Sequence, residues 1–239
     1  MSTNEGDSFQ SPVSSFQGVP PAPPAGEGGT GPEAESCEPT ARIERRLPAF
    51  YAAFFYAFPA AVAWIWLHHS MPGRSAALWA PADWPLDLAA GVGAGAALAA
   101  VSWLFGRAFA WSRRLEAEFG WILGAQRNWE IAWIALLSGC AEEYLFRGAL
   151  QEKFGIWVAT GVFAVVHWPL NRNFLPWPFV AGAVGLGLGG LAILTDSLVA
   201  PAAAHAVVNF VNLRRITGRF RTWDEDRVNR YVETGKEAA

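Results

Sequence analysis

The chain has 239 residues, of which 52% are hydrophobic and 16% are charged, and its formal net charge is −3. This composition is typical of a membrane protein, and no basic patch interleaved with aromatics indicates nucleic-acid binding. The two cysteines, Cys37 and Cys140, are too few for a disulfide framework or a cysteine-based zinc site. Cys140 lies in an apolar segment, where a small buried hydrophobe is favoured over a cysteine nucleophile.

Both ends of the chain are polar. Residues 1–40 are rich in Pro, Gly, Ser and Glu, which predicts a disordered cytoplasmic tail because so little apolar surface cannot offset the entropy of ordering. No apolar run follows a basic start, so this segment is not expected to be a secretory signal. Residues 41–222 form the predicted transmembrane domain, and residues 223–239 form a polar C-terminal tail.

Apolar runs alternate with short polar breaks from residue 47 onward. This pattern predicts an all-α fold, a polytopic transmembrane helix bundle of about six spans. The predicted spans are 47–67, 86–106, 129–152, 155–168, 177–195 and 198–213. A helix needs ~20 apolar residues to cross a bilayer, and the fourth and sixth runs are shorter than this. Such short runs suit helices that end against a polar cavity or are shielded by their neighbours.

Arginines are concentrated in alternate loops between the predicted spans. They lie before the first span, in the 107–128 loop and after the last span. The basic residues of the loops on the opposite side are only Arg74 and Lys153. Under the positive-inside rule, this asymmetry predicts that both termini lie in the cytoplasm. The expected location is the inner (plasma) membrane, with multiple crossings.

Small residues recur at intervals of four on two of the spans. Gly91-x-x-x-Gly95 marks the second span, and Ala181-x-x-x-Gly185-x-x-x-Gly189 marks the fifth. Such faces let helix backbones approach closely in lipid, so both are predicted to be packing surfaces. A substrate groove is the alternative interpretation.

Ionisable side chains lie inside three of the apolar runs, where they are costly and therefore usually functional. Counted along ideal helices from the nearest polar breaks, the three groups reach similar depths. They could therefore meet in one buried polar pocket. The three motifs are Glu142-Glu143-x-x-x-Arg147, Phe163-x-x-x-His167 and His205-x-x-x-Asn209.

The i,i+4 spacing gives each motif an internal geometry. Glu143 and Arg147 share a helix face and can pair, whereas Glu142 points ~100° away and has no evident partner. Phe163 can form a wall on one side of the His167 ring. A carboxylate in a low-dielectric site beside an imidazole suits a general base, which predicts hydrolytic chemistry.

Residues 138–213 resemble the core of the CPBP family, which groups type II CAAX prenyl endopeptidases with bacteriocin-processing and self-immunity proteins. The three motifs stand in the family's order, with EEYLFR at 142–147, FAVVH at 163–167 and HAVVN at 205–209. The resemblance implies a glutamate-dependent intramembrane endopeptidase. Residues 41–222 would then be its protease domain, with the motif core at 138–213.

Carried over position by position, the resemblance also implies roles for the motif residues. The four that match catalytic positions are Glu142 and His167, which would activate water, and His205 and Asn209, which would stabilise the oxyanion. Those that would support the site are Glu143, Arg147 and Phe163. The substrate would be cleaved near its C-terminus or membrane anchor.

Two other functions fit the same residues. Glu142, His167 and His205 are a reasonable set of ligands for a zinc peptidase, but the chain lacks His-Glu-x-x-His. We therefore expect neither a metal nor another cofactor. The second alternative is a non-catalytic immunity or scaffold protein that binds a membrane peptide. The expected partners are the lipid bilayer and a membrane-anchored protein or peptide, not nucleic acid.

Overall fold

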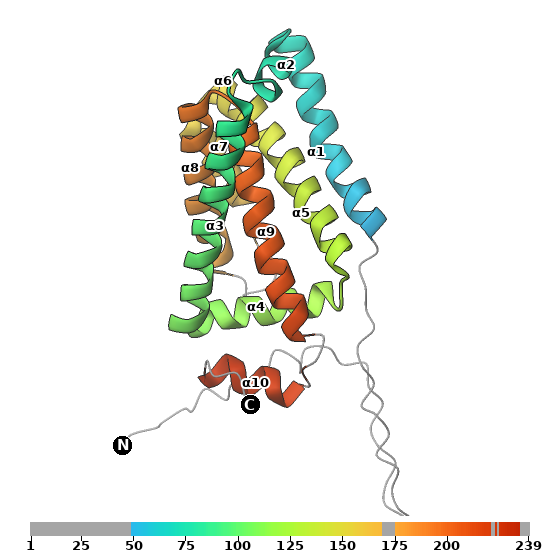
Figure 1. Cartoon of the computed structure of the whole chain (residues 1–239), viewed down its shortest axis with the longest axis vertical. Helices are drawn as coiled ribbons and strands as arrows, with labels where there is room; N and C mark the ends of the chain where they lie inside the picture. The colour runs from blue at the N-terminus through green and yellow to red at the C-terminus, as the bar shows by residue number, and fades with distance from the viewer. Residues whose placement is uncertain (1–48, 169–174, 221–222, 224, 235–239) are drawn as a thin grey trace, which may run out of the picture. The chain divides into compact units, whose positions relative to one another are not determined.

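The computed structural model describes residues 49–168, 175–220, 223 and 225–234, which form helices joined by short turns (Figure 1). In chain order these are α1 (Ala49–Ser70), α2 (Arg74–Trp79), α3 (Trp84–Ala108), α4 (Ala110–Leu123), α5 (Asn128–Glu143), the π-helix η2 (Tyr144–Gln151), α6 (Glu152–Phe154), α7 (Ile156–Val166), α8 (Trp177–Thr195), α9 (Val199–Phe220) and α10 (Glu225–Thr234). The all-α prediction is confirmed. The predicted disordered tail at 1–40 lies outside the described residues.

Three helices in the described part of the chain are long and apolar enough to cross a membrane, namely α1, α3 and α8. Their surfaces carry large exposed apolar side chains, such as Phe54 at 82% exposure and Leu194 at 84%. Hydrocarbon accommodates such surfaces far better than water does. The chain is an integral membrane protein, and the full count of six crossings stays a prediction.

Each predicted span overlaps a helix, and the span at 177–195 has the same bounds as α8. The span predicted as one helix at 129–152 differs, because it is α-helical only as far as Glu143 and then widens into η2. Turns of π-helix are rare in proteins and frequent at functional sites. This one begins directly after the two adjacent glutamates of the first motif.

The central helix α9 packs against α3 on one side and α5 on the other (Figure 1). A Cβ atom added at Gly95 of α3 would lie 2.5 Å from the Ala204 carbonyl oxygen and 2.7 Å from Cβ of Val207. At Gly185 of α8, it would lie 3.0 Å from Cδ1 of Phe163. Both small-residue faces therefore contact neighbouring helices closely, which confirms the prediction that they are packing surfaces.

Helix α4 lies within the segment 107–128, which the sequence pattern predicts to be a loop. Its buried Glu116 accepts hydrogen bonds from Arg215 at 2.5 Å and Arg219 at 2.8 Å, both on α9, and from the Tyr231 hydroxyl of α10 at 2.9 Å. Burial and the adjacent Glu116 carboxylate raise the pKa of Tyr231 to about 12. The network joins the end of α9 to two helices whose sequences lack a long apolar run.

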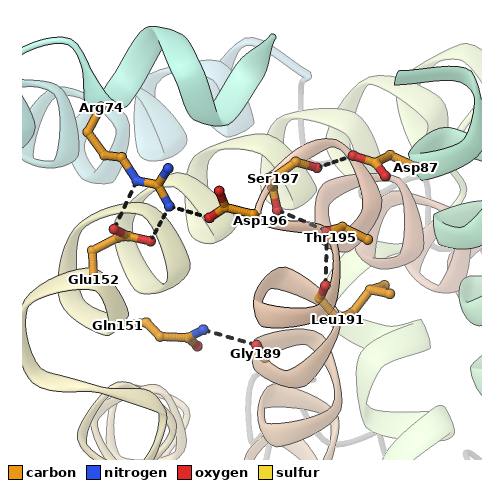
Figure 2. A network of polar contacts seen from close by, with 9 residues as sticks. All are labelled: Arg74, Asp87, Gln151, Glu152, Gly189, Leu191, Thr195, Asp196 and Ser197. Atoms are coloured by element: carbon orange, nitrogen blue, oxygen red, sulfur yellow. Dashed lines mark hydrogen bonds and ion pairs between the residues drawn. The ribbon is translucent and has the colours of Figure 1, made fainter. Parts of the chain in front are cut away.

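A second polar network joins the turn between α8 and α9 to three other helices (Figure 2). Arg74 at the start of α2 donates to both carboxylate oxygens of Glu152 at 3.0 Å and to Asp196 at 2.6 Å. Ser197 donates to Asp87 of α3 at 2.6 Å. Asp196 adopts the left-handed conformation with φ of 48°. These contacts fix the point from which α9 begins.

Candidate active site

The first motif lies at the junction of α5 and η2. The Glu143 side chain is fully buried, and its Oε1 lies 3.0 Å from Nη1 of Arg147. Arg147 also donates from Nη2 to the backbone carbonyl of Gly185 at 2.8 Å. The ion pair expected from the i,i+4 spacing is therefore present. It holds η2 against α8 and leaves neither buried charge without an opposite charge.

His205 of α9 contacts the same buried glutamate. Its Nδ1 lies 2.8 Å from Oε1 of Glu143. Oε1 of Glu143, which also binds Arg147, belongs to an ionised carboxylate and can only accept a hydrogen bond. Nδ1 of His205 therefore carries a proton, and Nε2 is left for other partners. Glu143 therefore contacts the third motif in addition to its own arginine.

Asn209 lies one turn beyond His205 and contacts α5. Its Nδ2 donates to Oγ of Ser138 at 2.9 Å, and Ser138 donates to the carbonyl of Ala135 at 3.0 Å. Position 138 thus pairs with 209, and position 143 pairs with 205. The two helices therefore run antiparallel here and are joined by two side-chain hydrogen bonds about one turn apart.

Glu142 faces the second motif. Its Oε2 lies 3.9 Å from Nε2 of His167, which is too long for a direct hydrogen bond. Nδ1 of His167 lies 2.7 Å from the carbonyl oxygen of Phe163, which can only accept, so Nδ1 carries the proton and Nε2 faces the carboxylate. The Glu142 and His167 side chains are 15% and 21% exposed, compared with 0% for Glu143.

The Phe163 ring contacts side chains from all three motifs. Its centroid lies 4.4 Å from that of His167 and 6.4 Å from that of His205. The guanidinium carbon of Arg147 lies 4.7 Å from the same centroid, and Phe146 packs perpendicular to the ring at 4.8 Å. One buried aromatic side chain therefore forms a shared wall for both imidazoles and the arginine.

Two hydroxyl residues reach the site without belonging to any motif. Ser138 is 1% exposed and lies one turn before Glu142 on α5. Tyr56 of α1 interacts with both Ser138 and Glu142. The i,i+4 spacing from Ser138 to Glu142 was the signal that could have identified the serine. Tyr56 had no such signal, because a tyrosine in an apolar span is usually a packing residue.

The two histidines of the zinc alternative are turned toward different glutamates. His167 faces Glu142, whereas Nδ1 of His205 is hydrogen-bonded to Glu143. Among the described residues, no three His, Cys, Asp or Glu side chains are grouped as a metal ion would require. This geometry gives the zinc alternative no support.

Comparison with known proteins identifies one family. Residues 124–211, which contain all three motifs, match the family model for "Type II CAAX prenyl endopeptidase Rce1-like". A stretch of 104 residues is 34% identical to the uncharacterized protein YpbD of Bacillus subtilis (strain 168) and covers 44% of this chain and 53% of YpbD. The chain thus spans about half the length of this relative. No solved structure matches the chain. Over residues 124–211, the chain is therefore similar to the Rce1-like type II CAAX prenyl endopeptidases, and this similarity agrees with the resemblance of its motifs to the CPBP family.

Proposed function

We propose that the chain is a glutamate-dependent intramembrane endopeptidase that hydrolyses a peptide bond near the C-terminus or membrane anchor of a membrane-associated protein. The difference between two adjacent carboxylates carries this proposal. The Glu143 side chain is fully buried and already binds Arg147 and His205. Glu142 is partly accessible and lies beside His167. The buried Oε2 of each glutamate makes no hydrogen bond to the described residues, so accessibility and the neighbouring imidazole are what distinguish Glu142. Of the two, Glu142 is the one available to act on water.

The first step is attack by a water molecule that contacts both Glu142 and His167. Glu142 takes a proton from this water while the water oxygen bonds to the scissile carbonyl carbon. His167 presents Nε2 to the same place, because its Nδ1 is held by the Phe163 carbonyl. The proton taken from water then passes to the amine as the carbon–nitrogen bond breaks. A general base of this kind contributes ~10²–10⁴-fold to the rate.

His205 and Asn209 are the proposed donors to the oxyanion. The Asn209 amide has two N–H groups, of which one donates to Ser138 and the other is left for substrate. His205 donates from Nε2 when both ring nitrogens carry protons, and Glu143 then supplies the opposite charge beside Nδ1. In a preorganised site, each such donor lowers the barrier by ~2.7–4 kcal/mol.

The test compares C-terminal peptides of membrane-anchored proteins by mass spectrometry. The samples are cells that contain the protein, cells that lack it, and cells that contain Glu142→Gln, which keeps the shape of the side chain but removes the base. Cleaved C-termini should be present only in the first sample. Glu152→Gln makes the same chemical change in the Arg74 network and should cleave normally. Identical peptides with wild type and Glu142→Gln would sink the proposal.

A further inference from the structure

The Asn209 side chain fits its place in two orientations, because the oxygen and the NH₂ end of an amide have nearly the same shape. Only one orientation turns the NH₂ end toward α5. In the flipped orientation, the carbonyl oxygen would occupy the place of the NH₂ group, and a group that now accepts an N–H hydrogen bond would face that oxygen instead. An oxyanion is stabilised by an N–H and repelled by a carbonyl oxygen, so the orientation matters for hydrolysis.

Ser138 determines which orientation is adopted. Its hydroxyl has a single proton, which is directed at the Ala135 carbonyl at 3.0 Å, and the Tyr56 hydroxyl is the other polar group, besides Asn209, that bonds to this serine. Toward Asn209, the Ser138 oxygen can therefore only accept, and Nδ2 is found 2.9 Å from it. The serine is 1% exposed, so water does not compete for its hydroxyl. A buried oxygen limited to accepting binds the NH₂ end and excludes the carbonyl end.

The position of Ser138 connects this bond to the proposed catalytic carboxylate. Ser138 and Glu142 are four residues apart on α5 and share a helix face. Tyr56, which lies outside the family-matched segment, interacts with both of them from α1. The contacts that orient Asn209 therefore lie on the same side of α5 as Glu142.

We propose that Ser138 is a positioning residue that accepts one N–H of Asn209 and thereby holds the second N–H for the oxyanion. The inference rests on the proposed function, in which Asn209 is an oxyanion donor. Removing the hydroxyl frees the amide to turn over, so part of the population then presents an oxygen to the developing negative charge. The loss should fall on kcat rather than KM, because the interaction forms only as that charge develops.

The kinetic test uses the full chain in nanodiscs with an internally quenched peptide that has an apolar anchor of ~20 residues and a polar C-terminal extension. Ser138→Ala should lower kcat about 10-fold or more with KM nearly unchanged, since a misplaced group can cost up to ~10²-fold. Asn209→Ala should lower kcat by ~10²-fold or more. The double variant should match Asn209→Ala alone, because Ser138 acts through that amide.

Thr217→Val is the matched control. Its hydroxyl is also buried in a helix and donates to a backbone carbonyl one turn earlier, that of Leu213. It should keep the wild-type kcat. A second measurement needs no substrate: the ¹⁵N side-chain amide spectrum of Asn209 should change in Ser138→Ala and not in Thr217→Val.

The outcomes separate this inference from the proposed function. If Asn209→Ala is impaired while Ser138→Ala has the wild-type kcat, only the positioning role is overturned. A double variant whose loss is the product of the two single losses would overturn it as well. An Asn209 amide spectrum that is the same in Ser138→Ala and wild type would show that the bond does not orient the amide. Wild-type kcat in Asn209→Ala would instead overturn the oxyanion role and, with it, the inference.

Discussion

Nδ1 of His205 lies 2.8 Å from Oε1 of Glu143, so the histidine of the third motif contacts the second glutamate of the first motif rather than Glu142. The same carboxylate oxygen lies 3.0 Å from Nη1 of Arg147. One buried carboxylate therefore joins α5, η2 and α9. Glu143 positions other residues of the site, while its neighbour Glu142 is left accessible beside His167.

Glu143→Gln should mainly lower the stability of the folded protein. The substitution leaves Arg147 buried without its opposite charge, and breaking one partner of a buried pair costs about 3–5 kcal/mol. Abundance in the membrane and thermal unfolding in detergent measure this loss. Glu142→Gln makes the same chemical change one residue away and should accumulate like the wild type. Equal losses of stability in both variants would show that the Glu143–Arg147 pair does not contribute more to stability than Glu142 does.

Gly95→Ala should destabilise the contact between α3 and α9. The added methyl group would lie 2.5 Å from the Ala204 carbonyl oxygen, so the helices must separate. Overpacking of this kind costs about 1–3 kcal/mol, and activity should fall too because α9 carries His205 and Asn209. Gly93→Ala is the control on the same helix, since its Cβ would have no neighbour within 4 Å. If the two variants unfold at the same temperature, the close packing of this face is refuted.

Arg74→Met should loosen the network that fixes the start of α9. The ion pair with Glu152 is partly exposed, so its loss should cost at most ~1 kcal/mol. Hydrogen exchange at the first turn of α9 should rise more than exchange at its centre. Lys153→Met removes a neighbouring cation and should leave that exchange unchanged. Uniform exchange along α9 in Arg74→Met and wild type would contradict the role of this network.

The same network predicts a dependence on acid pH. The hydrogen bond from Arg74 holds the pKa of the Asp196 carboxyl below its ordinary value of 3.8. Because the pKa is lowered in the folded protein, the contribution to stability is complete above 3.8 and is lost as the pH falls through the lower folded value. Unfolding temperature measured from pH 6 down to pH 3 should therefore fall more steeply for wild type than for Arg74→Met. Parallel curves would show that the ion pair contributes nothing.

Residue pairs within one helix could be predicted from the sequence. For contacts between helices, the sequence indicated which faces pack and which motifs meet, but not which residues pair. The i,i+4 spacing was enough to pair Glu143 with Arg147, because both lie on one helix face. The bond from His205 to Glu143 depends on how α9 is rotated against α5, and motif spacing does not contain that rotation. Apolar runs located α8 to the residue, but α4 and α10 are amphipathic and short, so hydropathy did not reveal them. Ser138 was missed because a buried helical serine ordinarily bonds only to its own backbone.

The orientation in the membrane gives the last prediction. Arginines are concentrated on one side of the predicted topology, which places Ala110 at the start of α4 in the cytoplasm and Ser70 at the end of α1 on the opposite side. Both positions are exposed, so Ala110→Cys and Ser70→Cys, each made in a Cys37→Ser Cys140→Ala background, can be labelled without disturbing the core. A membrane-impermeant thiol reagent added to intact cells should label Ser70→Cys alone, and permeabilised cells should label both. Helix α3 lies between these positions and is long enough to cross the bilayer once, so labelling of both or neither in intact cells would show that it does not cross. Labelling of Ala110→Cys alone would keep the crossing but reverse the proposed orientation, with the ends of the chain then outside the cytoplasm.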